Sequence, residues 1–279
     1  MKRGRTANIF DGKVAIITGA GSGIGKGLAE ELARRGAVVV ISDVDAQRIA
    51  QVADGIRRSG GNVTSSVLDV ADYGAVKNMI EDAVAEHGRV DYIFNNAGIA
   101  VGGAAKDFSI DDWRCVIDVN LYGVVNGVAV SYPLMVKQGF GHIINTASIE
   151  GLAPFPATAS YVASKYGVVG LSSALRIEGA EHGIKVSAVC PGYVKTAIFT
   201  DSKQVNIDKD KVEEMPDWTG VSPEECARTI LRGVERNDAI ILVTLFAKFM
   251  WALNRLSPGL VIVLMRRSYR QAREKGILK

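Results

Sequence analysis

The sequence predicts one doubly wound α/β domain with a seven-stranded parallel sheet, followed by a C-terminal helical extension. Short β-branched runs alternate along the chain with longer stretches whose apolar residues recur at helical spacing. Such alternation is typical of right-handed βαβ units. Several of the short runs, such as Val38–Ser42, are almost continuously apolar, which is typical of parallel strands that are buried on both faces.

Seven runs are expected to be strands, with helical stretches between them. These runs are Lys13–Thr18, Val38–Ser42, Val63–Leu68, Asp91–Asn95, His142–Thr146, Lys185–Cys190 and Ala239–Val243. Because they fill residues 11–244 without a linker, we expect a single domain there, with a short tail at 1–10 and the extension at 245–279.

Residues 194–220 interrupt this pattern, because they carry many charges and little periodicity. We expect a loop or lid there. A helix should follow from Ser222-Pro223, since serine is a good N-cap and proline suits the first helical position.

The net charge of +3 is unevenly distributed. Residues 1–10 carry +3 and residues 245–279 carry +7, whereas residues 11–244 hold 22 basic and 29 acidic groups, a net charge of −7. Nucleic-acid binding requires a basic face on the folded domain. We therefore expect no nucleic-acid partner.

The composition is that of an ordinary globular protein, with 48% hydrophobic and 23% charged residues, and it excludes a disordered chain. The three cysteines (Cys115, Cys190 and Cys226) show neither metal-ligand spacing nor a disulfide framework, so we expect buried thiols and no metal. The N-terminus has no long apolar segment typical of a secretory signal. These features favour a cytoplasmic location.

A glycine-rich segment, Thr18–Gly25 (TGAGSGIG), follows the first strand and opens the first helix. Glycines there allow a tight turn and a close approach to a pyrophosphate, and the helix N-terminus offers free amides to phosphates. This context predicts a Rossmann-type dinucleotide site. Its expected cofactor contacts are Gly19, Gly21, Ser22, Gly23, Ile24 and Gly25.

Asp43 ends the second strand, eighteen residues after Gly25. A carboxylate there can accept hydrogen bonds from the adenine ribose and would repel a 2′-phosphate. Ser22 is not basic and no arginine directly follows Asp43, so the sequence favours NAD over NADP. A solvated acid at a strand end is the alternative, and Asp45 is close enough to compete for the same role.

Tyr161 and Lys165 are spaced i, i+4 and share one face of a predicted helix. A nearby ammonium should lower the pKa of the phenol, which could then act as a general acid or base. Ser148 ends the fifth strand, at the sheet edge where parallel sheets bind ligands. Taken alone, the pair also fits an ordinary surface tyrosine and lysine.

Together these motifs resemble the short-chain dehydrogenase/reductase family over about residues 10–244. Thr18–Gly25 resembles its TGxxxGxG loop, Asn95–Gly98 its NNAG segment, and Tyr161 and Lys165 its YxxxK motif. The cofactor contacts that the resemblance implies are Asp69, Val70, Asn96, Ala97, Gly98, Pro191, Gly192, Val194 and Thr196, together with Tyr161 and Lys165.

The resemblance implies an NAD(P)-dependent oxidoreductase that transfers a hydride between nicotinamide and a small secondary alcohol or ketone. In that family Tyr161 would exchange the proton with the substrate and Ser148 would hold the reacting oxygen. Lys165 would lower the pKa of Tyr161 and bind the nicotinamide ribose. Asn120 would hold a water in a proton relay to Lys165. A homodimer or homotetramer is also implied.

The substrate pocket is expected to include Glu150 and Tyr193 beside Ser148 and Tyr161. Glu150 fits a solvated loop acid equally well. The apolar segment Gly151–Pro156 favours a mainly hydrophobic, lipid- or steroid-like substrate. The alternative function is a nucleotide-binding regulatory or scaffold protein that kept the fold and lost turnover, against which the complete set of four catalytic residues argues.

The extension at 245–279 departs from the family pattern. Its first part carries apolar residues at helical spacing, Leu260–Met265 is apolar all round, and basic residues follow. We consider a cap over the pocket or a subunit interface, contact with an anionic membrane surface, and a transmembrane span. Charges and Pro258 interrupt every window of eighteen residues, so the span is least favoured.

Overall fold

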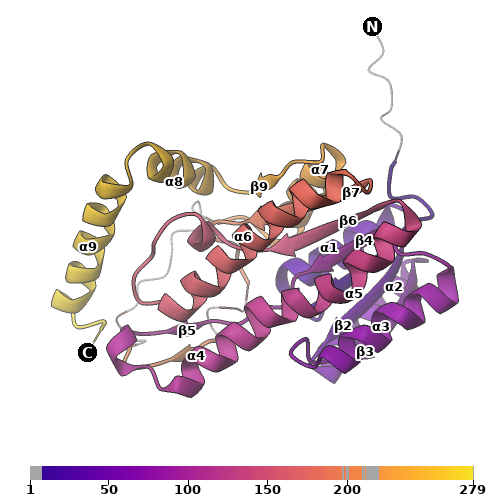
Figure 1. Cartoon of the computed structure of the whole chain (residues 1–279). Helices are drawn as coiled ribbons and strands as arrows, with labels where there is room; N and C mark the ends of the chain where they lie inside the picture. Colours follow the sequence, from indigo (N-terminus) through magenta and orange to yellow (C-terminus); the bar gives the residue numbers. More distant parts are fainter. Residues whose placement is uncertain (1–7, 197, 199–200, 209–210, 212–219, 279) are drawn as a thin grey trace, which may run out of the picture.

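The computed structural model describes residues 8–196, 198, 201–208, 211 and 220–278. Seven parallel strands form the central sheet in the order β3-β2-β1-β4-β6-β7-β9 (Figure 1). Their bounds are β1 Val14–Thr18, β2 Val38–Asp43, β3 Asn62–Val67, β4 Tyr92–Asn95, β6 Gly141–Thr146, β7 Ile184–Cys190 and β9 Ile240–Leu242. The predicted doubly wound parallel sheet is thus confirmed. All five residues of β1 are buried, as expected for a central strand.

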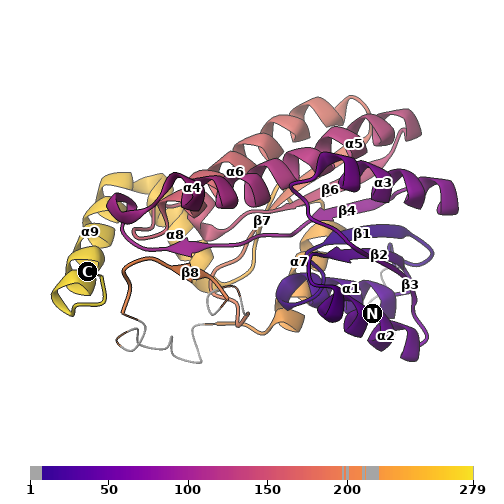
Figure 2. The ribbon, with the colours of Figure 1, turned by 90° about the horizontal axis from the view of Figure 1, so that it is seen from below.

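Helices cover both faces of the sheet, so the protein has three layers (Figure 2). One face carries α1 Gly23–Arg34, α2 Ala46–Arg58 and α7 Pro223–Glu235, and the other α3 Tyr73–His87, α4 Ile110–Ile117, α5 Gly123–Gln138 and α6 Ala159–Ala180. Each face encloses its own hydrophobic core, with Leu28 and Ile230 in one and Ile80 and Val168 in the other.

The sheet order places a topological switch between β1 and β4. The chain runs outward from β1 to β3 and then returns to pair β4 with the free side of β1. Ligands of open parallel sheets bind at such a point, beyond the carboxyl ends of the strands. Those ends are Thr18 and Asn95, from which the predicted cofactor segments continue.

A π turn, Asp118–Tyr122, joins α4 to α5. Ile110–Gln138 therefore forms one long helical stretch, which is the only one among the described residues with the length and hydropathy of a membrane span. Length and hydropathy alone do not identify a membrane span, since core helices of other proteins meet the same criteria. In this fold α5 packs along α3 and β6.

The predicted lid lies partly outside the described residues, since positions 197, 199–200, 209–210 and 212–219 are not among them. Its described part includes β8 Lys203–Gln204, which pairs with β5 Val101–Gly102 in a second small sheet. Lys203 Nζ lies 2.6 Å from Asp112 Oδ1, and this contact holds the pKa of Asp112 down at about 2. The helix predicted after the lid is confirmed, with the Ser222 hydroxyl accepting the Glu225 N–H.

The C-terminal extension forms two helices, α8 Leu245–Leu256 and α9 Pro258–Glu274 (Figure 1). Met250 of α8 and Val261 of α9 are buried against the core that α5 and α6 share. The Asn254 side chain donates to the Leu152 carbonyl at 2.9 Å. The extension therefore packs beside the segment that follows β6.

Candidate active site

The glycine loop between β1 and α1 forms a tight cradle. Gly19 and Gly23 have φ of +64° and +53°, a region that favours glycine. A Cβ at Gly19 would lie 2.7 Å from Ala97 Cα, and one at Gly25 would lie 2.6 Å from Asn96 Nδ2. The Ser22 side chain makes no capping bond at the start of α1, so the first amides face the loop. This geometry fits a dinucleotide pyrophosphate.

Asp43, the last residue of β2, and Asp45, two residues later, make different hydrogen bonds. Asp43 Oδ2 accepts the Gly21 N–H at 2.8 Å, so this carboxylate lies against the glycine loop. Asp45 caps α2, accepting the amides of Gln47 and Arg48 at 2.9 Å each. Asp43, rather than Asp45, is therefore the acid that lies against the glycine loop.

Arg48 is a basic residue near the loop that sequence reasoning missed. Its Cβ would lie 3.0 Å from a Cβ at Gly21, although it follows Asp43 by five residues. The guanidinium is shared between Asp45, at 3.3 Å, and Asp201, at 3.1 Å. These carboxylates compete with any phosphate for Arg48.

Asn96 ties the carboxyl ends of three strands together. Its amide nitrogen donates to the carbonyls of Thr18 and Gly19 at 3.0 and 3.3 Å, and its oxygen accepts from Thr146 Oγ1 at 3.3 Å. The Thr18 hydroxyl in turn accepts the amides of Asn96 and Ala97. These bonds position the glycine loop over the switch point.

Four further predicted cofactor residues, Gly98, Thr196, Asp69 and Val70, lie near the glycine loop or after β3. A Cβ at Gly98 would lie 3.5 Å from Lys165 Nζ, and a Cβ at Gly23 would lie 3.0 Å from the Thr196 methyl group, so Gly98 borders the predicted catalytic lysine and Thr196 borders the glycine loop. Asp69 and Val70 follow β3, where the Asp69 carboxylate accepts the Ala71 amide.

The turn after β7 lies beside the active-site segment. The Pro191 carbonyl accepts the Ile149 amide at 2.8 Å. Val194 is buried and pairs with Val221. Gly192 and Tyr193 lie between these two anchors, so the predicted turn adjoins Ser148.

The predicted catalytic residues converge beyond β4 and β6. Lys165 is only 2% exposed. Its Nζ donates to the Thr146 carbonyl at 2.8 Å and lies 5.4 Å from the centre of the Tyr161 ring. A hydrogen bond joins Tyr161 to Ser148. The geometry therefore brings phenol, hydroxyl and amine into one site.

Asn120 is fully buried in the π turn, and its side chain is already satisfied. Its oxygen accepts the Ile99 amide at 2.8 Å, while its nitrogen donates to the Ile99 carbonyl at 2.9 Å and to Ser164 Oγ at 3.2 Å. The side chain thus fixes the β4–β5 segment against α6. π turns often mark functional sites because they shift the backbone hydrogen bonds.

The pKa of Tyr161 corrects one expectation. We expected Lys165 to lower it, but burial raises the pKa above its ordinary value and the nearby Glu150 carboxylate raises it further. The hydrogen bond from Ser148 opposes these effects. Burial also lowers the pKa of Lys165 to about 8, so desolvation governs both groups.

Glu150 belongs to the site rather than to a solvated loop. It lies in the 3₁₀ turn Ile149–Gly151, whose start is capped by Ser148 Oγ accepting the Glu150 amide at 3.1 Å. Thr158 Oγ1 donates to Glu150 Oε2 at 2.6 Å. Burial raises the pKa of Glu150 to about 7.

Sequence reasoning missed several partners of these residues. Thr158 and Ser164 hold Glu150 and Asn120, and only their positions next to the Tyr161–Lys165 motif could have suggested them. Cys190 is buried near Lys165, and burial raises the pKa of its thiol to about 12, as expected for an inert cysteine. Cys226 is also buried, but Cys115 is exposed, so the prediction of buried thiols is wrong for Cys115.

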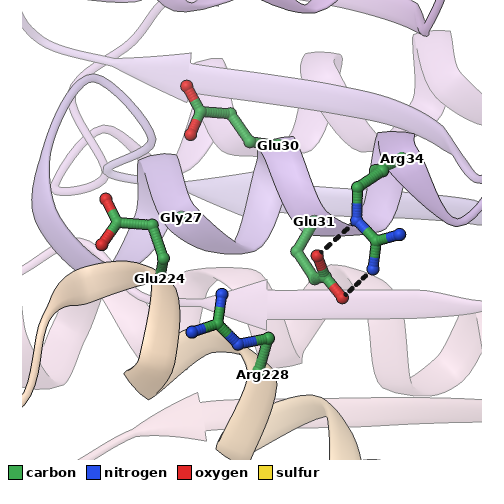
Figure 3. Close-up of a pocket in the computed structure, with 6 residues that line it drawn as sticks. All are labelled: Gly27, Glu30, Glu31, Arg34, Glu224 and Arg228. Atoms are coloured by element: carbon green, nitrogen blue, oxygen red, sulfur yellow. Dashed lines mark hydrogen bonds and ion pairs between the residues drawn. The ribbon is translucent and has the colours of Figure 1, made fainter.

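A surface hollow of about 220 Å³ lies away from this site (Figure 3). It lies between α1 and α7, where Arg34 makes two hydrogen bonds to Glu31. None of its lining residues is a predicted site residue, and it belongs to the ionic packing of the two helices. Among the described residues, no group of His, Cys, Asp or Glu has the arrangement of a metal site.

Comparison with known proteins adds independent findings. A family model described as short chain dehydrogenase matches residues 13–206. The protein SadH of Mycobacterium tuberculosis is 38% identical, with 97% of each chain covered, and a cyclohexanol dehydrogenase of an Acinetobacter strain is 39% identical over 80% of this chain and 88% of its own. A short chain dehydrogenase/reductase from Burkholderia phymatum, solved with NAD, has a TM-score of 0.80 and 31% identity, with 90% of this chain and 95% of that chain covered.

Proposed function

Because the chain belongs to the short-chain dehydrogenase/reductase family, we propose that it transfers a hydride between NAD and a mainly hydrophobic secondary alcohol or ketone. The observation that carries this proposal is the meeting of Ser148, Tyr161 and Lys165 beside the glycine loop. The NAD complex of the Burkholderia relative and the name of the Acinetobacter relative support the cofactor and the substrate class.

The preference for NAD rests on Asp43. Its carboxylate is held against the loop by the amides of Gly21 and Asp45, which leaves it facing the place of the adenine ribose. A 2′-phosphate there would meet a negative charge. Arg48 could favour NADP, but its pairing with Asp45 and Asp201 opposes this.

Tyr161 would exchange the proton with the substrate oxygen. Ser148 Oγ accepts the Glu150 amide, and its hydroxyl bonds to Tyr161, so a substrate oxygen placed between the two side chains would receive the Ser148 hydrogen in place of Tyr161. Bound NAD would supply the hydride acceptor at its nicotinamide ring. Because the pKa of Tyr161 is raised, its neutral form suits donation to a ketone at pH 7, and alcohol oxidation should accelerate as the pH rises.

A proton relay would run from Tyr161 toward Lys165 and the π turn. The Asn120 side chain is occupied by Ile99 and Ser164, so we assign the relay water to the backbone of the turn rather than to this side chain. Lys165 is held for this role by the Thr146 carbonyl.

The substrate pocket would be mainly apolar. Leu152 and Ala153 are buried just after Glu150, and Phe155 packs against the same core as Trp251 of α8. Glu150 is the acid beside the catalytic tyrosine and would meet any polar group of the substrate. We also expect a homodimer or homotetramer, which sedimentation can check.

The test is a spectrophotometric screen of secondary alcohols and ketones with NAD and NADP. Tyr161→Phe should abolish turnover and leave NAD affinity nearly unchanged, whereas Tyr166→Phe, a more exposed position on the same helix, should behave as wild type. A Tyr161→Phe variant that retains more than a few per cent of the rate would contradict the proposal. NAD binding without turnover across the screen would favour a regulatory or scaffold protein.

A further inference from the structure

The C-terminal extension concentrates the exposed apolar side chains of the protein. Eighteen large hydrophobic residues are exposed in the described part of the chain, and eight of them lie between positions 245 and 264. Leu245 and Leu256 are 82% and 85% exposed. The eight residues are Leu245, Phe246, Phe249, Leu256, Leu260, Ile262, Val263 and Leu264.

The helices α8 and α9 each carry apolar residues on two sides, and the rest of the protein covers only one of these sides. In α8, Ala247 and Met250 are buried in the protein, whereas Leu245, Phe249 and Leu256 recur at spacings of four and seven and form one exposed stripe. In α9, Val261 is buried, and exposed apolar residues flank it on both sides. The uncovered stripe therefore needs a partner to remove it from water.

The charges beside this stripe indicate the kind of partner. Residues 245–279 contain one acid, Glu274, against eight basic residues, while the body of the protein is acidic. Seven of the basic residues are described, and all seven are exposed. They are Lys248, Arg255, Arg266, Arg267, Arg270, Arg273 and Lys275. An apolar helix face bordered by lysine and arginine is typical of helices that lie on anionic membranes.

A second copy of the chain fits the surface less well. A two-fold contact through α8 and α9 would place the same patch on both sides of the interface. Two cationic extensions would then face each other, which opposes association. An anionic lipid surface would bury the apolar stripe and would attract the basic side chains.

We propose that α8 and α9 dock onto the surface of an anionic lipid bilayer. The exposed stripe of α8 and the first turns of α9 would enter the boundary between headgroups and acyl chains, and the basic half of α9 would lie among the phosphates. The opposite side of α8 rests on the segment after β6, through Asn254 and Leu152. This proposal does not depend on the proposed reaction.

The test is flotation of the full-length protein with vesicles of phosphatidylcholine, with and without phosphatidylglycerol. We expect binding to the anionic vesicles at low salt, weaker binding at high salt, and little binding to phosphatidylcholine alone. Each basic side chain near such a surface contributes about fivefold in affinity, so Arg266→Glu with Arg270→Glu should weaken binding by at least roughly 25-fold. Leu245→Glu with Phe249→Glu should weaken it comparably.

Matched controls lie on helices distant from the extension. Arg57→Glu with Arg58→Glu, on α2, changes the net charge equally, and Tyr73→Glu, on α3, replaces another exposed aromatic residue. All the altered positions are exposed, and thermal melts should confirm folding. The proposal is overturned if wild type does not float with anionic vesicles, if it binds neutral vesicles equally, or if extension and control variants behave alike. A loss of assembly mass in Leu245→Glu with Phe249→Glu, without vesicle binding by wild type, would identify a subunit contact instead.

Discussion

Replacing Glu150 by glutamine should stabilise the protein at alkaline pH and leave its stability near pH 4 almost unchanged. The Glu150 carboxyl lies in the segment after β6, and its Oε2 accepts a hydrogen bond from the Thr158 hydroxyl at 2.6 Å. Burial disfavours the charged form and raises the pKa to about 7 from an ordinary value of 4.5. Glutamine keeps an oxygen that can accept the Thr158 hydrogen bond and carries no charge to desolvate.

The size and sign of the effect follow from proton linkage. The folded protein holds the Glu150 proton up to about pH 7, whereas the unfolded chain releases it near pH 4.5. Between these values the unfolded state binds fewer protons, so stability falls as the pH rises. The full loss is about 3 kcal/mol at 1.36 kcal/mol per pH unit. This is an upper limit, because part of the Glu150 side chain remains accessible to water.

Urea unfolding at pH 4.5 and at pH 8 measures this difference. The stabilisation by Glu150→Gln should be near zero at the lower pH and should approach 3 kcal/mol at the higher pH. Glu178→Gln, at an exposed position of α6, is the control and should show no pH-dependent gain. An equal effect of Glu150→Gln at both pH values would refute the reasoning. If the chain oxidises alcohols, the variant should also reach half-maximal rate at a lower pH, because the charge that raises the pKa of Tyr161 is gone.

Two further predictions concern the cofactor loop. Gly25→Ala places a Cβ within 2.6 Å of Asn96 Nδ2, and overpacking typically costs about 1–3 kcal/mol, so a fluorescence titration should show about 5- to 150-fold weaker NAD binding, and unchanged affinity would contradict the described loop. Asp43→Asn removes charge-assisted hydrogen bonds that contribute about 1.5–3 kcal/mol, so KM for NAD should rise by about 10- to 100-fold while KM for NADP falls or stays the same. An equal rise in KM for both cofactors would argue against a role for Asp43 in their discrimination.

Sequence patterns predicted the central sheet well because its inner strands, such as β1, are mainly apolar runs, whereas the edge strand β3 is largely polar and exposed. The run expected at Lys13–Thr18 is β1, Val14–Thr18, and all seven expected runs appear as strands. The strands β5 and β8 were not predicted, because two residues each are too short to show any periodicity. The π turn at Asp118–Tyr122 likewise has no residue pattern that distinguishes it from an α-helical turn.

The sequence predicted the side chains of the site that form motifs. It did not predict the contacts made by backbone groups or the pKa shifts caused by burial. Tyr161 and Lys165 are spaced for one helix face, but Lys165 is anchored by the Thr146 carbonyl, and any residue type could supply that group. The direction of the Tyr161 pKa was wrong for a related reason. It depends on desolvation and on Glu150, which is eleven residues away in sequence, and spacing along a helix reports neither.

The extension contacts both the lid segment and the segment that follows β6. Leu278 pairs with Ile207 of the lid segment, and the Asp208 amide donates to the Ile277 carbonyl at 2.9 Å. At its other end, Asn254 of α8 bonds to Leu152, two residues after Glu150. The extension thus presents the uncovered faces of α8 and α9 to a proposed membrane, while α8 contacts the segment that carries Glu150 and the residues after α9 contact the lid segment. Docking on lipid would therefore fix the orientation of the substrate side of the site relative to the bilayer, which is the arrangement that a hydrophobic substrate dissolved in that bilayer requires.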